Sequence, residues 1–264
     1  MMANWNTNIL VVWDRQIQQF FSVPRYFILS LSALTLLGGM IRFGAYLQDP
    51  LLSRDAIFYW QKIQIWLQGG WSELSIDTGL MFPGLVRRLM QCGLSFEVAG
   101  VSCNLLAGTL LIAAVGRLGR RLCCSGIAGM IAAALIAGHP SLIQLSYEIQ
   151  RESLYLLFSV LALDAGYEGI VEARRIFMML AGVMTAWAAA TRYEGIELLL
   201  FPCIGVWLAV EESFQKILFR MLIFLFFFGT GIVLGFTLNY FLLGIPMEYF
   251  LNGLIARIRY FVFC

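Results

Sequence analysis

Acidic and basic side chains occur together at three places in the chain where their spacing could support chemistry. The first is Ser53-Arg54-Asp55, at the start of a segment from Asp55 to Leu67 that we expect to be helical. A carboxylate there could serve as a general base. Alternatively, Asp55 is an ordinary first-turn acid favoured by the helix dipole. The residues alone leave both interpretations open.

The second place is the sequence from Glu148 to Glu152. Glu148 and Glu152 are one helical turn apart, and Arg151 is placed to pair with Glu148 three positions away. This spacing favours a solvated helix start with a local ion pair. It also allows a carboxylate with a role in catalysis.

The third place is Thr191-Arg192-Tyr193-Glu194-Gly195, a tight turn between two apolar stretches. An arginine in such a turn could hold a phosphate by two parallel hydrogen bonds. Glu197, one turn further on, suggests a charge network that faces an aqueous cleft. The alternative for Arg192 is a snorkelling charge at the membrane edge.

The composition indicates the environment in which these residues work. The 264-residue chain is 60% hydrophobic and 13% charged, with a mean hydropathy of +0.80. Soluble domains are about 45–50% apolar and roughly 25% charged, so this chain is predicted to be an integral membrane protein. Its 18 basic and 16 acidic residues nearly cancel, which excludes a field for binding nucleic acid.

Seven apolar stretches approach the length of about 20 residues that spans a bilayer as a helix. We therefore expect an all-α polytopic protein with about seven transmembrane helices and a long first outer loop that carries an interfacial helix. Trp60 and Trp66 of that helix are expected at headgroup level. The expected spans are 27–47, 97–116, 122–138, 152–170, 176–191, 194–210 and 219–244. The expected segments are 1–26 (cytoplasmic), 27–245 (transmembrane domain, with the outer loop at 48–96) and 246–264 (an outer C-terminal tail, expected to be truncated).

Basic residues in the short loops predict the orientation, because they collect on the cytoplasmic side. Those that follow the second and fourth spans are Arg117, Arg120, Arg121, Arg174 and Arg175. All three charged sequences then lie on the opposite, extracytoplasmic face. Asp164, Glu168 and Glu172 are expected to neutralise Arg174 and Arg175, and Arg42 is expected to snorkel from the first span.

One span followed by Ser53-Arg54-Asp55-Ala-Ile-Phe-Tyr59-Trp60-Gln61 resembles the GT-C-type polytopic glycosyltransferases, in particular the protein-mannosyltransferase and aminoarabinose-transferase-like bacterial branch. Arg151-Glu152-Ser153-Leu-Tyr155 and the turn at 191–195 are similar to segments that recur in that branch. The resemblance covers about residues 27–210.

The resemblance implies a transferase that moves a sugar from a polyprenyl-phosphate donor to a lipid, glycan or protein acceptor. The reaction would occur on the periplasmic face of the inner membrane. The resemblance assigns the catalytic acids to Asp55 and Glu152, and substrate binding to Arg54, Tyr59, Arg151, Arg192 and Glu194. A divalent metal could bridge carboxylates and phosphate, but no ligand spacing requires one.

The chain departs from the family pattern at two points. Members with a paired acidic motif have Asp-Glu, whereas Asp55 stands between Arg54 and Ala56. Family chains are also usually longer, so a truncated C-terminal half is expected. The alternatives are a component of a membrane transporter, which would place polar residues at the membrane midplane, and a non-catalytic or inactive fragment of such an enzyme.

Overall fold

The computed structural model describes residues 21, 23–48, 54–68, 79–171, 174–200 and 214–244. These residues are helical apart from short turns, and no strand occurs among them. By length and composition, four of the described helices could cross a membrane: α2 (Pro24–Gln48), α5 (Phe96–Leu122), α8 (Glu152–Val171) and α11 (Phe214–Leu243, from Met221 on). This all-helical architecture agrees with the predicted polytopic membrane protein.

By length and composition, the described residues contain four or five of the seven expected spans. The predicted span 122–138 is α6 (Gly126–Gly138), which is followed after His139 by α7 (Pro140–Tyr147) at a bend of 61°. Proline has no N–H to continue a helix and is well suited to begin one, which accounts for the break. Counting this bent pair as one broken span gives five candidates among the described residues.

Two further predicted spans are only partly matched. The helix α9 (Arg175–Thr191) is apolar but has 17 residues, fewer than the four long helices. A short 3-10 helix, η2 (Tyr193–Leu199), follows it, and most of the predicted span 194–210 lies outside the described residues. The C-terminal tail 246–264 and the N-terminal residues 1–20 also lie outside them.

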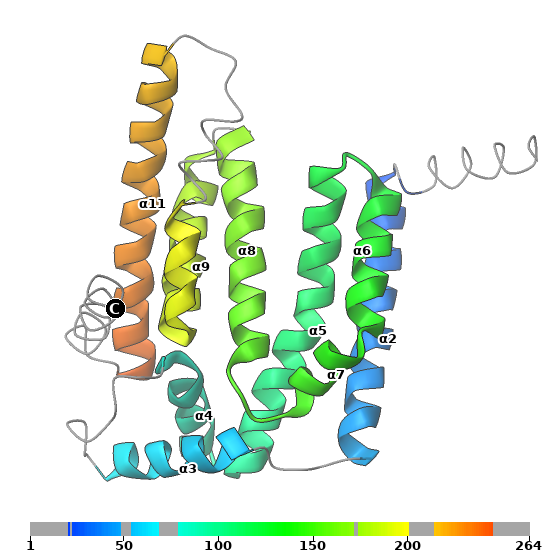
Figure 1. Ribbon diagram of the computed structural model, residues 1–264, viewed down its shortest axis with the longest axis vertical. Coiled ribbons are helices and arrows are strands. Elements are labelled where there is room, and N and C mark those ends of the chain that lie inside the picture. The colour runs from blue at the N-terminus through cyan, green and yellow to red at the C-terminus, as the bar shows by residue number, and fades with distance from the viewer. Residues whose placement is uncertain are drawn as a thin grey trace, which may run out of the picture.

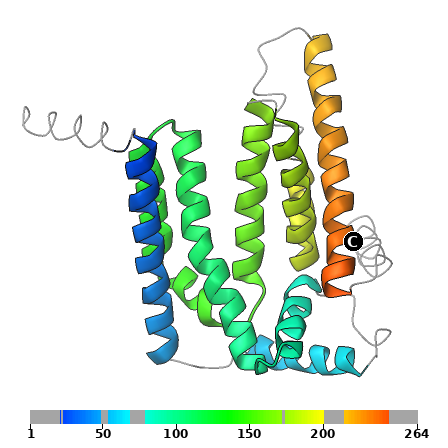
Figure 2. The same ribbon diagram turned by 180° about the vertical axis from the view of Figure 1, so that it is seen from behind.

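The long helices stand side by side, with α9 between α8 and α11, and α5 packed against α8, α6 and α2 (Figures 1 and 2). Two shorter helices, α3 (Arg54–Leu67) and α4 (Met81–Gln91), lie at the lower end of Figure 1, where α3 runs across the bundle. The start of α8 and the end of α9 lie at the same end. Three segments far apart in sequence therefore meet there.

The backbones of α9 and α11 pack closely against each other. A Cβ added at Gly231 of α11 would collide with the carbonyl oxygen of Met179, and one added at Gly182 of α9 would collide with that of Phe228. Small residues allow helix backbones to approach in a membrane, where packing rather than water exclusion drives association. These glycines hold α9, and with it the turn that follows it, in place.

The helix α3 packs on protein along one side. Its buried apolar side chains are Ala56, Tyr59, Ile63 and Trp66, at spacings of three and four residues. The expectation for Trp66 is wrong, because its side chain is 2% exposed and lies under the Arg87 guanidinium, 4.3 Å from the ring centre. Trp60 is 41% exposed and packs edge-on against Phe96, as its position on the outer side of the helix requires.

Arg42 does not snorkel but is fully buried in α2. Its guanidinium donates hydrogen bonds to the carbonyl oxygens of Ile136 (2.9 Å) and Ala137 (3.2 Å), and its Nε donates to Ser146 Oγ (3.0 Å). The break between α6 and α7 leaves the last carbonyls of α6 without helical N–H donors. Arg42 supplies those donors, which is why its charge is held inside the protein.

Candidate active site

The centre of the site is an arginine that bridges two carboxylates. Arg192 Nη1 donates to Glu152 Oε1 at 2.8 Å. Its Nη2 and Nε donate to Glu194 Oε1 and Oε2 at 3.2 and 3.4 Å. The hydrogen bond with Glu194 raises the pKa of Arg192 most, and the negative charges of Glu194 and Glu152 raise it further, so the guanidinium remains charged. We call Arg151, Glu152, Arg192 and Glu194 the Glu152 cluster.

The backbone around Arg192 fixes this side chain. α9 ends at Thr191, Arg192 is extended, and η2 turns the chain back so that Glu194 lies beside the guanidinium. A Cβ added at Gly79 would collide with the carbonyl oxygen of Thr191, so only glycine allows the chain before α4 to pass so close. The Arg192 guanidinium also lies 5.6 Å from the ring centre of Tyr155.

The two carboxylate oxygens of Glu152 differ in their hydrogen bonding. Its Oε1 accepts from Arg192 and lies 3.9 Å from Arg151 Nε. Its Oε2 is buried and has no hydrogen-bond partner among the described residues. A buried carboxylate oxygen without a donor is unfavourable and rare. A ligand hydroxyl would find an acceptor there.

The predicted pair between Arg151 and Glu148 is not formed. Glu148 instead accepts from the side-chain amides of Gln144 (2.6 Å) and Gln150 (2.8 Å). α8 begins at Glu152, so Glu148 lies before the helix and Arg151 turns toward Glu152. The nearest acid to Arg151 is therefore its sequence neighbour.

Tyr59 connects α3 to this cluster. The side chain is buried, and its ring packs edge-on against Phe82 with centroids 5.2 Å apart. Burial raises the pKa of Tyr59, which keeps the phenol protonated. The charged groups that also act on that pKa are Arg151, Glu152, Asp55 and Arg192. The phenol is thus within electrostatic range of both predicted catalytic acids.

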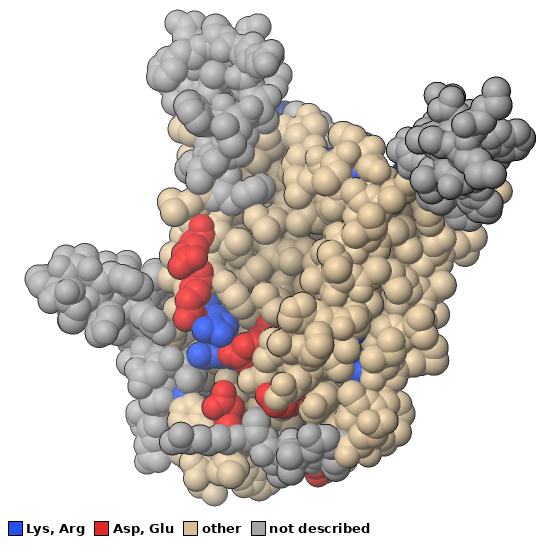
Figure 3. All heavy atoms as spheres, turned by 45° about the vertical axis from the view of Figure 1, so that its right-hand side comes forward, with Lys and Arg blue, Asp and Glu red and all other residues tan. Residues whose placement is uncertain are grey.

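The structure brings together most of the residues that the sequence predicted. Asp55 lies in the first turn of α3, is exposed, and acts on the pKa of Tyr59 together with Arg151, Glu152 and Arg192 of the Glu152 cluster. The side chain of Arg54 lies outside what the structure describes. Glu197 is exposed and makes no ion pair among the described residues, so it does not join the cluster. Figure 3 shows acidic side chains gathered around basic ones toward the lower end of an otherwise largely uncharged face.

An apolar groove next to Asp55 was not foreseen from the sequence. It has a volume of about 530 Å³ and lies between α3, α4 and the start of α5. Its lining includes Ala56, Ile57 and Trp60 of α3, with Met90 and Phe96 opposite. The sequence did contain a sign of this groove. Ile57 and Trp60 are apolar although they lie on the outer side of α3, which is not the side that packs on the protein.

No group of three or more His, Cys, Asp or Glu side chains is placed to hold a metal ion within the part of the chain that the structure describes. Comparisons of the chain with protein-family models, with curated proteins and with solved structures found no match.

Proposed function

We propose that this chain is a membrane glycosyltransferase that takes a sugar from a polyprenyl-phosphate donor and passes it to a lipid, glycan or protein acceptor of the cell envelope. The observation that carries the proposal is the meeting of Asp55, Tyr59 and the Glu152 cluster at one end of the bundle. An exposed carboxylate, a buried phenol and two arginines there offer the groups that such a transfer needs.

In the proposed reaction, Asp55 accepts the proton of an acceptor hydroxyl. The hydroxyl oxygen then attacks the anomeric carbon of the donor sugar. The bond from that carbon to the phosphate oxygen breaks, and its electron pair leaves with the lipid phosphate. General-base assistance of this kind contributes roughly 10²–10⁴-fold. Asp55 suits the role because it is exposed, whereas Glu152 is held by Arg192.

The contacts of Arg192 and Arg151 support different roles for the two side chains. Arg192 uses Nη1 on Glu152 and both Nη2 and Nε on Glu194, so it has little left for a phosphate. Arg151 makes its ion pair with Glu152 at 3.9 Å, and its Nη groups make no hydrogen bond among the described residues. Arg151 is therefore assigned to the leaving phosphate, and Arg192 to holding Glu152, whose Oε2 would accept a sugar hydroxyl.

The groove beside Asp55 supports a lipid-linked donor over a soluble one. Ile57 and Trp60 on one wall and Phe96 on the other give it apolar sides, which suit a prenyl chain. The chain would lie in this groove with the phosphate directed at Arg151. The active face would then be periplasmic, on the inner membrane, as the basic loops predict.

A transfer assay in membranes tests the proposal. Membranes that contain the chain are given a polyprenyl-phosphate donor with a labelled sugar, and the label is followed into lipid, glycan and protein fractions. Asp55→Asn should lower transfer by at least about 100-fold, the lower end of general-base assistance. Glu197→Gln, which removes another exposed charge at the same end, should leave transfer within about twofold of wild type.

Two results would contradict the proposal. Full transfer by the Asp55→Asn variant removes Asp55 from the mechanism. Absence of transfer by the wild-type chain from every polyprenyl-phosphate donor tried, with the chain folded in the membrane, favours the inactive fragment.

One feature of the structure resembles a transporter, but its hydrogen bonds indicate a structural role. A broken helix beside a buried charge is typical of transporters, and α6–α7 with Arg42 fits that description. All three guanidinium nitrogens of Arg42 nevertheless donate to carbonyl or hydroxyl oxygens of the protein. The charge is used to hold the broken helix, which favours a structural role.

A further inference from the structure

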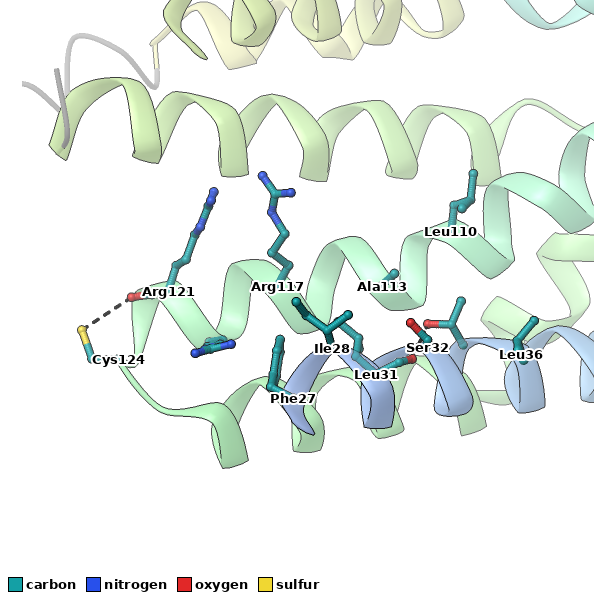
Figure 4. Close-up of a pocket in the computed structure, with 12 residues that line it drawn as sticks. Phe27, Ile28, Leu31, Ser32, Leu36, Leu110, Ala113, Arg117, Arg121 and Cys124 are labelled. Atoms are coloured by element: carbon teal, nitrogen blue, oxygen red, sulfur yellow. Dashed lines mark hydrogen bonds between the residues drawn. The ribbon is translucent and has the colours of Figure 1, made fainter. Parts of the chain in front are cut away.

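A second groove lies toward the opposite end of the bundle, between α2 and α5. Its volume is about 840 Å³. Apolar side chains form most of its walls, among them Leu31 and Leu36 of α2 and Leu110 of α5 (Figure 4). Its lining also includes Arg117, Arg120 and Arg121, near the end of α5. The groove therefore has a long apolar part and a positively charged end.

The position of the groove indicates that it faces lipid. α2 and α5 are both long and apolar enough to cross a membrane. Ile28, Leu36 and Leu110, which line the groove, are 58%, 67% and 52% exposed. The lining of α2 extends from Phe27 to Leu36, about 14 Å along a helix, which is long enough to hold much of an acyl chain.

The charges at the end of the groove do not cancel. Arg117, Arg121 and Arg174 make ion pairs with the buried acids Asp164 and Glu168. We call these five residues the Glu168 cluster. Arg120 lies 4.5 Å from the ring centre of Phe27 and has no acidic partner among the described residues. Among the described residues, the three arginines that line the groove exceed the two acids by one positive charge.

Arg120 is placed to use that excess charge. The Phe27 ring holds the Arg120 guanidinium at the lip of the groove, where its N–H groups remain for a ligand. The Arg117 side chain is 51% exposed although its Nε bonds Asp164 at 2.7 Å. In Figure 4, Arg117 and Arg121 extend from α5 away from α2 and the apolar lining. An anionic group at this end of the groove would therefore meet Arg120 rather than Arg117 or Arg121.

We infer that this groove binds an anionic phospholipid from the surrounding leaflet, with its phosphate on Arg120 and an acyl chain between α2 and α5. Basic pockets between spans are the usual binding sites for anionic headgroups. The apolar part selects a lipid over a free phosphate. The inference does not depend on the proposed transferase activity, because it uses other residues at the other end of the bundle.

Lipid retention by the purified full chain tests the inference. The chain is reconstituted in mixed phosphatidylglycerol and phosphatidylcholine, extracted in mild detergent, and its bound lipid is counted by native mass spectrometry. Phosphatidylglycerol should be retained in preference to phosphatidylcholine. Arg120→Gln should lower that preference about fivefold, which corresponds to the roughly 1 kcal/mol expected for each basic residue near an anionic lipid.

Arg175→Gln is the matched control. Arg175 also lies over a phenylalanine, 5.5 Å from the ring centre of Phe227, but it does not line the groove. This variant should retain phosphatidylglycerol within about twofold of wild type, since surface charges outside the groove contribute little. Equal losses in the two arginine variants would overturn the inference in favour of a diffuse surface charge.

Ser32→Phe tests the apolar part without a change in charge. Ser32 is an exposed residue in the lining of the groove, so the added ring should displace the acyl chain and lower retention while the melting temperature stays the same. Three other outcomes would overturn the inference: equal retention of the two lipids by the wild type, an unaffected Ser32→Phe variant, and a change of oligomeric mass in that variant, which would assign the groove to a second copy of the chain.

Discussion

The acids at the two ends of α8 differ in how completely their carboxylate oxygens are paired. At its far end, Asp164 and Glu168 have every carboxylate oxygen in an ion pair, with Arg117, Arg121 and Arg174 as partners. At its start, Glu152 has one oxygen bound by Arg192, while the other is buried without a partner among the described residues. The two clusters are separated by about 24 Å along one helix.

This difference suggests a structural role for the fully paired acids and ligand binding for Glu152. A buried acid whose oxygens are all paired has no site left for a ligand, and removing one member of such a network leaves uncompensated charge. An acid with a free buried oxygen has an incomplete set of partners, which a substrate can complete. Such unsatisfied groups require an explanation in a native protein, and ligand binding is one.

The largest effect that would sharpen this comparison is expected at the Glu168 cluster. Glu168→Gln removes the acid that Arg121 and Arg174 share, and should lower the free energy of unfolding by about 3 kcal/mol. Unfolding by denaturant in detergent micelles measures it. Arg117→Gln is the control, because Asp164 keeps Arg121 and the change should cost under about 1 kcal/mol. Equal losses of unfolding free energy in the two variants would show that the buried acids are no more important to the network than the exposed arginine.

The same substitution at the other end of α8 should have a smaller effect on stability. Glu152→Gln leaves Arg192 paired with Glu194 and should cost about 1 kcal/mol. Under the proposed function it should also abolish sugar transfer, which Glu168→Gln should lower only in proportion to the folded fraction. A stability loss as large as that of Glu168→Gln, with transfer intact, would make the two clusters equivalent.

A still smaller effect is expected from Arg192→Lys. An ammonium keeps the charge but cannot bond Glu152 and both oxygens of Glu194 in one plane. The free energy of unfolding should fall by about 0.5 kcal/mol, while the Michaelis constant for the donor rises because Glu152 is no longer held. An unchanged Michaelis constant would show that the bridging geometry is not needed.

The smallest effect concerns Tyr59 and pH. Burial raises the pKa of Tyr59 in the folded chain above its ordinary value of 10.0. The unfolded chain therefore releases the phenolic proton first, so this contribution to stability is complete below pH 10 and is lost as the pH rises above it. Tyr59→Phe should lack this alkaline loss, which unfolding measured on both sides of pH 10 would detect. Parallel pH profiles would show that Tyr59 is not in a desolvated site.

Hydropathy predicted the long helices closely, because a helix in a membrane must satisfy its own backbone and requires an apolar run of fixed length. The expected spans 97–116 and 152–170 correspond to α5 (Phe96–Leu122) and α8 (Glu152–Val171). The predicted span 122–138 also ends where α6 (Gly126–Gly138) ends, but hydropathy did not predict the short helix α7 (Pro140–Tyr147), which is too short to be recognised as a span.

Charge pairing was predicted less well. The sequence favoured neighbours, and so placed Arg151 with Glu148 and left Asp164 to Arg174 and Arg175. The structure pairs Arg192 with Glu152 across 40 positions and Arg121 with Asp164 across 43. The pair of Arg174 with Glu168 is confirmed, because only six residues separate them. Long-range pairs depend on which helix faces lie together, and local spacing does not contain that information.

The sequence by itself therefore determined that the chain is helical and membrane-embedded, and that Asp55, Glu152 and Arg192 come to one end of it. The physical reason is that hydropathy and the alternation of short loops fix where each helix begins and ends. Only the tertiary structure decided that Arg192 holds Glu152, that Trp66 is buried, that Arg42 bonds the broken helix, and that two grooves exist. Each of these depends on side chains from separate helices, whose contacts are set by packing.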